Sequence, residues 1–238
     1  GCGTRERKGQ YWSIWQSACG GKIKELTERL DAMEAAIRKP SFRQSSGKAN
    51  EVNYWIFDYP PEKELEVRER IEYMKHKNSK GTDGFGLVVF DLYDIIIDFL
   101  EGKNFIEKCC EFEKKRGIQR IVKAVSNSMK VSEDDSLIVQ YILDHTPENA
   151  IVFLTGVGKS YPLLRSHNVL NNLHQSYLHA PVVMFFPGTY NEQELIPFNE
   201  IKDYHYYKPF RLVKLWRCCI ANQGYDCQGR RKYTRRTK

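Results

Sequence analysis

The residues whose types and spacing could do chemistry lie in "VFLTGVGKSYP", residues 152–162. An apolar segment runs into Gly156, Gly158, Lys159 and Ser160, and a nucleotide-binding P-loop likewise joins an apolar strand to a Gly-Lys-Ser turn. In a P-loop, backbone N–H groups cradle the phosphates, the lysine reaches the β- and γ-phosphates, and the serine or threonine holds Mg²⁺. Phosphate binding by Lys159 is therefore the first hypothesis that the sequence raises.

The spacing within this stretch argues against a P-loop. The motif needs a glycine five residues before its Gly-Lys pair, and that position is Phe153, inside the apolar segment. Pro162 is tolerated only in the first turn of a helix. "LVVFD", which ends in Asp91, resembles the strand that supplies the second carboxylate of such enzymes, but α/β proteins of many kinds share that pattern. We predict a tight strand-to-helix turn; loose anion binding and a degenerate nucleotide-binding domain are the alternatives.

A helix is predicted over residues 160–179, directly after the turn. Apolar residues at helical spacing define its core face, namely Leu163, Leu170, Leu173 and Tyr177. Amides lie on the other side, namely Asn168, Asn171, Asn172 and Gln175, with Arg165 at the border. Because asparagine is a poor helix former, the amides indicate contact with a loop or a partner; a solvated polar face is the alternative.

Other sets of reactive residues lack the spacing that catalysis or metal binding needs. His167 and His174 are seven residues apart, and no third ligand follows from the spacing, so no metal site is predicted. There is no G-x-S-x-G nucleophile motif. Cys109 and Cys110 lie among apolar residues, which favours buried thiols. We therefore expect neither an enzyme nor a bound cofactor.

Two strand ends and one aromatic segment are further candidates. Asp58 closes the apolar segment 53–59, and Tyr190 follows the Pro-Gly turn after residues 181–186. Open α/β sheets place ligand-binding groups at such strand ends. The segment "KDYHYYKPF", residues 202–210, interleaves aromatic and basic residues. It is typical of base stacking, of a protein-binding patch, or of the underside of a last strand.

The elements that must position these residues alternate along the chain. Apolar stretches predict strands over 53–59, 87–92, 150–156, 181–188 and 207–216. Helical spacing predicts helices over 22–39, 61–77, 93–102, 104–116, 118–130, 133–146 and 160–179, with a polar loop over 41–51. This order predicts an α/β fold, a layered domain with a mainly parallel central sheet flanked by helices, Rossmann-like or degenerate P-loop-like.

The net charge of +7 is concentrated at the two ends of the 238-residue chain. Residues 217–238 carry seven Lys or Arg against one Asp, residues 1–22 carry four against one Glu, and the remainder is mildly acidic. We predict an irregular N-terminal extension over 1–21, one α/β domain over 22–216, and a disordered basic tail over 217–238 that would attract polyanions without sequence preference. No apolar stretch is long enough to span a membrane, and no signal peptide is expected.

Four long segments resemble, in order, the BrxB family of the bacteriophage exclusion (BREX) defence systems. They are "WIFDYPPEKELEVRERI", "VFLTGVGKSYPLLRSHNVLNNLH", "PVVMFFPGTYNEQELIPF" and "DYHYYKPFRLV". The resemblance covers roughly residues 22–215 and excludes both ends. In that family the turn reads TGVG and the following Lys-Ser is not required, which supports a turn rather than a phosphate site.

The resemblance implies a cytoplasmic, non-catalytic component of an anti-phage system that acts beside a PglZ-type alkaline-phosphatase-like protein. It implies binding of the PglZ-type protein, with RNA or DNA binding as the alternative, and self-association stays open. The residues that match the family's segments are Trp55, Asp58, Tyr59, Gly156, Gly158, Arg165, His167, Asn171, Asn172, Gly188, Tyr190, Tyr206, Tyr207 and Phe210.

Overall fold

The computed structural model describes residues 26–44, 53–78, 84–131, 136–176, 180–191, 194–198, 203–204 and 209–213. Contacts between residues divide the chain into two units. The unit of residues 32–213 holds the sheet; in the unit of residues 1–31 and 214–238, only the start of helix α2 (Leu26–Ile37) is described. The predicted N-terminal extension and basic tail lie outside the described residues, and the predicted 22–216 boundaries stay a prediction.

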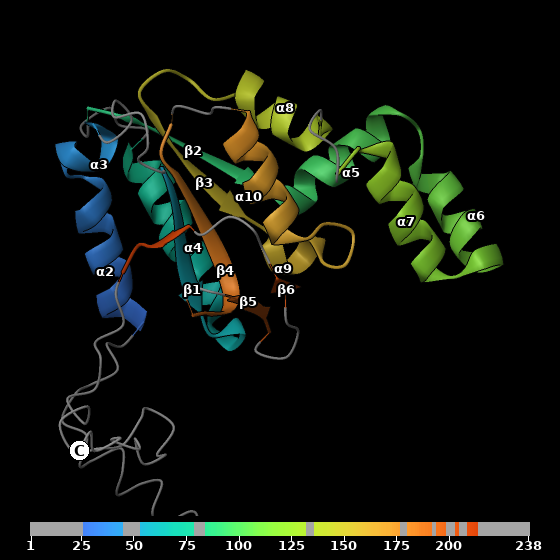
Figure 1. Ribbon diagram of the computed structural model, residues 1–238, viewed down its shortest axis with the longest axis horizontal. Helices are drawn as coiled ribbons and strands as arrows, with labels where there is room; N and C mark the ends of the chain where they lie inside the picture. The colour runs from blue at the N-terminus through green and yellow to red at the C-terminus, as the bar shows by residue number, and fades with distance from the viewer. Residues whose placement is uncertain are drawn as a thin grey trace, which may run out of the picture. The chain divides into compact units, whose positions relative to one another are not determined.

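A parallel sheet forms the centre of the unit of residues 32–213 (Figure 1). Its strands are β1 (Tyr54–Tyr59), β2 (Gly86–Asp91), β3 (Ala150–Thr155), β4 (Val182–Tyr190) and β7 (Phe210–Arg211), in the order β2-β3-β4-β1-β7. Pairing is parallel throughout this path. The predicted α/β fold with a mainly parallel sheet is therefore confirmed.

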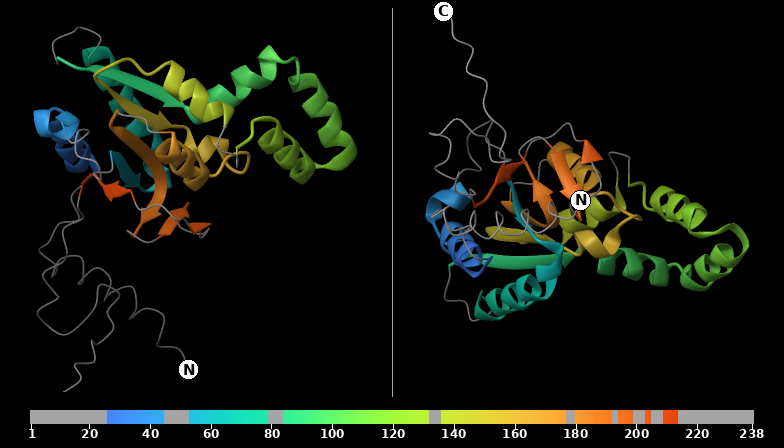
Figure 2. Two further views of the ribbon diagram at one scale, coloured as in Figure 1. Left: turned by 45° about the horizontal axis from the view of Figure 1, so that its top comes forward. Right: turned by 90° about the horizontal axis from the view of Figure 1, so that it is seen from below.

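The central strands are apolar runs because helices cover both faces of the sheet. Residues 150–154 of β3 and 182–188 of β4 are buried without a break. Helix α4 (Glu64–Asn78), entered through the short 3-10 helix η2 (Pro61–Lys63), lies on one face, and α8 (Leu137–Asp144) and α10 (Ser166–Gln175) lie on the other (Figure 2). The strand ends are thereby fixed in a rigid frame, and the side chains that follow them are positioned by it.

Strand β4 continues into an antiparallel extension that the sequence did not predict. It pairs with β5 (Glu194–Pro197), which pairs with β6 (Asp203–Tyr204). Gly188 lies where β4 closely approaches β5, and a Cβ there would overlap the carbonyl oxygen of Ile196. The predicted turn at Pro187-Gly188 instead lies within the nine-residue strand β4.

Three helices, followed by α8, lie between β2 and β3 along the chain. They are α5 (Leu92–Gly102), α6 (Ile106–Arg116) and α7 (Ile118–Ser128). Helices α6 and α7 form a hairpin that projects away from the sheet (Figures 1 and 2). No residue of α6 is buried, whereas Ile121 and Val125 of α7 are.

Two predicted elements differ from the structure. The helix predicted over 160–179 begins only at Ser166 as α10, and a separate short helix, α9 (Val157–Ser160), precedes it; the chain leaves α9 at Tyr161, which precedes Pro162 and has an extended backbone. The helical region is sterically disfavoured for a residue that precedes proline. The loop predicted over 41–51 begins as helix α3 (Pro40–Gln44), whose proline lies in the first turn, where it needs no N–H partner.

None of the described helices combines the length and the apolar character needed to span a membrane.

Candidate functional site

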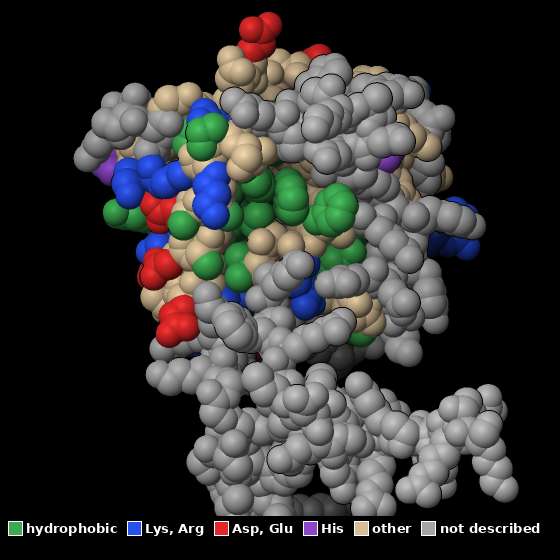
Figure 3. Space-filling view, turned by 60° about the vertical axis from the view of Figure 1, so that its left-hand side comes forward, with side chains coloured by type: hydrophobic (Ala, Val, Ile, Leu, Met, Phe, Trp, Pro, Cys, Tyr) green, Lys and Arg blue, Asp and Glu red, His purple; other side chains and the backbone are tan. Residues whose placement is uncertain are grey.

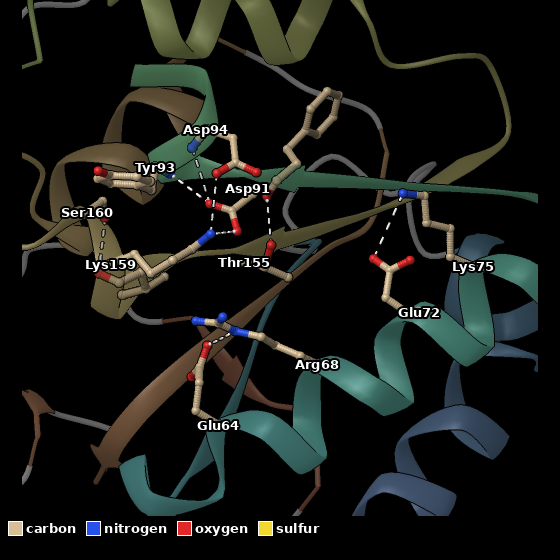
Figure 4. Close-up of polar contacts among 12 residues, drawn as sticks. Glu64, Arg68, Glu72, Lys75, Asp91, Tyr93, Asp94, Thr155, Lys159 and Ser160 are labelled. Carbon is tan, nitrogen blue, oxygen red and sulfur yellow. Dashed lines mark hydrogen bonds and ion pairs between the residues drawn. The ribbon is translucent and has the colours of Figure 1, made fainter. Parts of the chain in front are cut away.

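A polar pocket of about 350 Å³ lies at the carboxyl ends of β2 and β3, and we call it the strand-end pocket. Its charged lining consists of Arg68, Glu72, Lys75, Asp91, Asp94, Asp98 and Lys159. Helix α4 supplies the first three (Figure 4), and α5 supplies Asp94 and Asp98. Parallel strands end here at one edge, which is where open α/β sheets place their ligands. The pocket also contains the two segments that resemble a P-loop enzyme.

Asp91 and Lys159, the two residues of that resemblance, are paired with each other. Lys159 Nζ lies 2.6 Å from Asp91 Oδ2 and 3.3 Å from Asp94 Oδ1. Asp91 also caps helix α5, because its Oδ1 accepts hydrogen bonds from the backbone N–H groups of Tyr93 and Asp94. The carboxylate is therefore engaged by the lysine and by the helix N-terminus at once.

This pairing affects the protonation of Lys159. Partial burial alone would lower the pKa of Lys159. The hydrogen bond to Asp91 and the negative charge of Asp91, followed by the smaller effects of Asp94, outweigh burial, so the pKa is raised above its ordinary value. The ammonium also lies 5.5 Å from the centre of the Tyr93 ring. The charge of Lys159 is therefore held by its own chain, and phosphate binding would have to displace two carboxylates.

The turn itself is tight, as the sequence predicted. Gly156 has a left-handed backbone, and a Cβ there would overlap the Asp91 carboxylate. Ser160 is buried and donates its hydroxyl to the Val157 carbonyl. A Cβ at Gly158 would lie 3.1 Å from Pro187 Cγ. The glycines thus permit close packing of the turn against α5 and β4, and the serine hydroxyl bonds to its own helix.

Helix α4 lies below the pocket in Figure 4, and its first residue, Glu64, contacts Tyr59 at the end of β1. The Tyr59 hydroxyl donates to Glu64, whose other oxygen accepts from Arg68 Nε at 2.8 Å. Burial raises the pKa of Tyr59, and the hydrogen bond to Glu64 and its negative charge raise it further. Tyr59 therefore stays a protonated donor and fixes the start of α4 against the end of β1.

Asp58 lies at the centre of a buried polar cluster that joins three strands. Its Oδ2 accepts from the Tyr190 backbone N–H at 3.2 Å and forms an ion pair with the Arg211 guanidinium at 3.1 Å. The Tyr190 hydroxyl donates to the Pro209 carbonyl at 2.6 Å. The structure thus connects β1, β4 and β7 through Asp58, a residue predicted as a candidate from its place at a strand end.

Trp55 and Phe210 come together at the β1–β7 edge. Their ring centres are 5.5 Å apart, and the ring of Phe42 of α3 lies tilted against Trp55 at 5.2 Å. Phe210 keeps 52% of its surface exposed. Hydrophobic side chains, with Lys and Arg beside them, also gather on the face in Figure 3, which carries the left-hand side of Figure 1. Tyr206 and Tyr207 lie outside the described residues.

The candidate residues in and around α10 differ in burial and in what they contact. Asn172 is buried and donates its amide to the Val131 carbonyl at 3.0 Å, so its amide is occupied by the segment that follows α7. Asn171 and His167 are half-buried, and Arg165, which precedes α10, is exposed. The prediction that the asparagine amides contact a loop is thus confirmed for Asn172, whereas its placement on the face opposite the core is wrong.

The α6–α7 hairpin carries a second pocket, which sequence reasoning missed. This α6–α7 groove has a volume of about 270 Å³, and its lining includes Leu100, Phe105, Cys109, Phe112, Ile121 and Val125. The prediction of buried thiols is wrong for Cys110, which is exposed, and Cys109 is half-buried. The composition of α6 could have indicated that this helix is exposed, because seven of its eleven residues are charged, which is too many for a buried helix.

The geometry does not bring a catalytic set together in the described part of the chain. No three His, Cys, Asp or Glu side chains there are placed to share a metal ion. The sequence did not identify Arg68, Asp94 and Arg211 as parts of these clusters. Asp94 and Arg211 contact candidates from distant segments, Lys159 and Asp58, whereas Arg68 contacts Glu64 one turn earlier in α4. Both polar clusters hold strands and helix starts in place.

Comparison with known proteins identifies relatives across most of the chain. Residues 88–212 match the family model "BREX protein BrxB". A BREX protein BrxB from Bacillus cereus (strain H3081.97) is 43% identical over 191 residues, which are 80% of this chain and 99% of the relative. A BREX protein BrxB from Escherichia coli O9:H4 (strain HS) is 31% identical over 188 residues, 79% of this chain and 92% of the relative. No solved structure matches significantly.

Proposed function

The chain belongs to the BrxB family of BREX proteins, and from this we propose that it is a non-catalytic subunit of a BREX anti-phage defence system that binds the system's PglZ-type protein. The observation that carries the non-catalytic role is the pairing at the strand ends. Lys159 is held by Asp91 and Asp94, and Asp58 is held by Arg211.

Catalysis at a strand end needs a charged or nucleophilic group that can reach substrate. The side chains that resemble such groups in this chain are engaged in holding the fold. Asp91 caps α5, Ser160 bonds within α9, and Tyr59 fixes the start of α4. These contacts favour a scaffold that presents surfaces to other proteins, because the side chains that could do chemistry are used to hold its own fold.

Co-elution in size-exclusion chromatography tests the binding of the PglZ-type protein. The full chain, mixed at micromolar concentration with the PglZ-type protein of the same BREX system, should elute with it as one complex. Separate elution of the two proteins would overturn the proposal.

A double variant, Lys159→Met with Asp91→Asn, tests the non-catalytic role, because phage resistance should survive wherever the variant still folds and co-elutes. Loss of resistance in an intact complex would indicate chemistry at the strand-end pocket.

Nucleic-acid binding is the second candidate, and the basic ends of the sequence favour it. Residues 217–238 carry seven Lys or Arg against one Asp. Such a segment attracts RNA and DNA through counter-ion release, with steep salt dependence and without sequence preference. Binding that disappears in the truncated chain 1–216 would be attraction by the tail, whereas sequence-selective binding that survives truncation would favour recognition by the α/β unit.

A further inference from the structure

We propose that the α6–α7 groove is the docking site for an acidic amphipathic helix of the partner protein. This inference rests on the proposed function for the partner's identity, and it adds the surface and the chemistry of the contact. It starts from α6, an eleven-residue helix in which no residue is buried.

A helix of this length is marginal by itself, and tertiary packing normally supplies its stability. In α6 the packing is one-sided. Cys109 and Phe105 lie partly against the core cluster, but Phe112 and Ile118, at the turn end of the hairpin, keep 38% and 54% of their surfaces exposed. The apolar side of the hairpin thus continues beyond the core as an uncovered strip that a partner could bury.

The groove has the form that receives a helix rather than a small polar ligand. It runs between two antiparallel helices, and Leu100, Ile121 and Val125, which belong to the hydrophobic core, line it. Its volume of about 270 Å³ is enough for two large apolar side chains. Amphipathic helices bind such grooves through apolar residues spaced three and four apart.

The charge of the hairpin specifies the partner's polar face. Among the described residues that line the groove, Lys108 is the charged one, and its ammonium lies 5.2 Å from the centre of the Phe105 ring. Arg116 and Arg120 flank the turn. Helix α6 has four basic residues against three glutamates, and α7 has two basic residues and no acidic one, so the two helices together carry a net charge of +3. Complementary charge therefore favours acidic residues on the helix that docks.

The same charges argue against two other occupants. The N- and C-terminal segments of this chain are themselves basic, so like charges disfavour their docking in the groove. A second copy related by a two-fold axis would place the same surface against itself. Two basic hairpins would then face each other, which costs free energy rather than contributing it.

Ala124→Glu is the decisive variant. Ala124 lines the groove, is exposed and lies within α7, so glutamate places a negative charge in the groove without altering a buried position. The complex of the full chain with the PglZ-type protein should weaken about tenfold or more. Gln119→Glu is the matched control, because it adds the same charge to the exposed opposite side of α7 and should leave affinity within about twofold.

A second pair of variants separates charge from shape. Lys108→Gln should weaken the complex about threefold to fivefold and make its affinity less dependent on salt, because it removes the cation in the groove wall. Lys114→Gln removes an equal charge from the exposed face of α6 away from the groove and should have little effect.

The outcomes distinguish this inference from the proposed function. If the wild-type complex forms and Ala124→Glu leaves it intact, the groove is not the docking site, although the proposed function stands. If no complex forms, the proposed function fails, and two synthetic eighteen-residue amphipathic helices, Leu/Glu and Leu/Lys, decide about the groove by fluorescence anisotropy. Preferential binding of the Leu/Glu peptide, lost in Ala124→Glu, supports the inference; equal binding or no binding overturns it. A wild-type dimer that Ala124→Glu dissociates also overturns it, because the occupant is then a second copy.

Discussion

The strand-end pocket and the α6–α7 groove differ in what their conspicuous residues contact. In the pocket, Lys159 and Asp91 pair with each other, and Asp91 also caps α5. In the groove, Phe112 keeps 38% of its surface exposed and Lys108 contacts the ring of Phe105. The pocket resembles a catalytic site in sequence but is used to hold the fold, whereas the groove has no sequence motif but retains surface that a partner can bury.

This difference shows that the type of a residue does not reveal whether its side chain is available to bind a substrate or a partner. A lysine or aspartate in a strand-end motif can be fully engaged by its own chain, and an unremarkable helix can be left without a covering layer. The comparison makes a general prediction: substitutions at the strand ends should change the free energy of unfolding, and substitutions in the groove should change binding. The predictions below test this separation, from the largest expected effect on stability to the smallest.

The largest effect is expected from Asp58→Ala. It removes the carboxylate that pairs with Arg211, whose side chain is only 11% exposed, and leaves a buried guanidinium without a counter-charge. The free energy of unfolding should fall by about 3–5 kcal/mol, as urea denaturation would show. The double variant Asp58→Ala with Arg211→Met should recover at least half of this loss. An equally large loss in the double variant would mean that the ion pair is not the source of the stability.

The fold could be predicted from the sequence because hydrophobic periodicity records burial. The uninterrupted apolar run at residues 150–154 predicted a strand covered on both faces, and β3 confirms it. The break at residues 161–165 was missed because the leucine spacing continues through it, although Pro162 marked the boundary. Strands β5 and β6 were missed because short antiparallel extensions depend on tertiary pairing more than on local pattern.

The candidate site could be predicted only in part. The failed glycine spacing at Phe153 predicted a turn at 156–160, and the structure confirms that turn. The pairing of Asp58 with Arg211 joins residues 153 positions apart, and no local spacing reports such a contact. The groove depends on α6 having no layer over it among the residues that the structure describes, and this is a property of the assembled fold and not of any one segment.

Gly156→Ala should have the next largest effect, a loss of about 2–3 kcal/mol in the free energy of unfolding. Alanine has to adopt the left-handed backbone, and its Cβ overlaps the Asp91 carboxylate that caps α5. Gly84→Ala is the control, since Gly84 also has a positive φ but its Cβ would meet nothing within 4 Å. It should cost about 1 kcal/mol. Thermal and urea unfolding would measure both, and equal losses would show that the contact with Asp91 is unimportant.

Lys159→Met should lower the free energy of unfolding by about 1 kcal/mol at neutral pH, because the ion pair with Asp91 is partly exposed. The folded state raises the pKa of Lys159, so this contribution is complete below its ordinary pKa of 10.5 and is lost as the pH rises through the raised value. The stability difference between wild type and variant should therefore shrink at high alkaline pH. Phage resistance and nucleotide affinity should not change. Loss of both would restore the P-loop interpretation.

Phe112→Ala should have the smallest effect on stability, because the ring is partly exposed and no residue of α6 is buried. The free energy of unfolding should change by less than about 1 kcal/mol, whereas the affinity for the partner should fall about fivefold or more.

Alkylation of the two adjacent thiols shows where the partner binds. Cys109 lines the groove and Cys110 is exposed, so the partner should protect Cys109 while Cys110 keeps reacting. Burial, and then the neighbouring Cys110, raises the pKa of Cys109, so the rates have to be compared with and without partner for each thiol separately. Protection of both thiols would place the contact over all of α6, and protection of neither would move the partner away from the hairpin.

If Phe112→Ala instead unfolded the protein while leaving binding intact, the hairpin would serve the fold as the strand-end pocket does, and the contrast between the two regions would disappear.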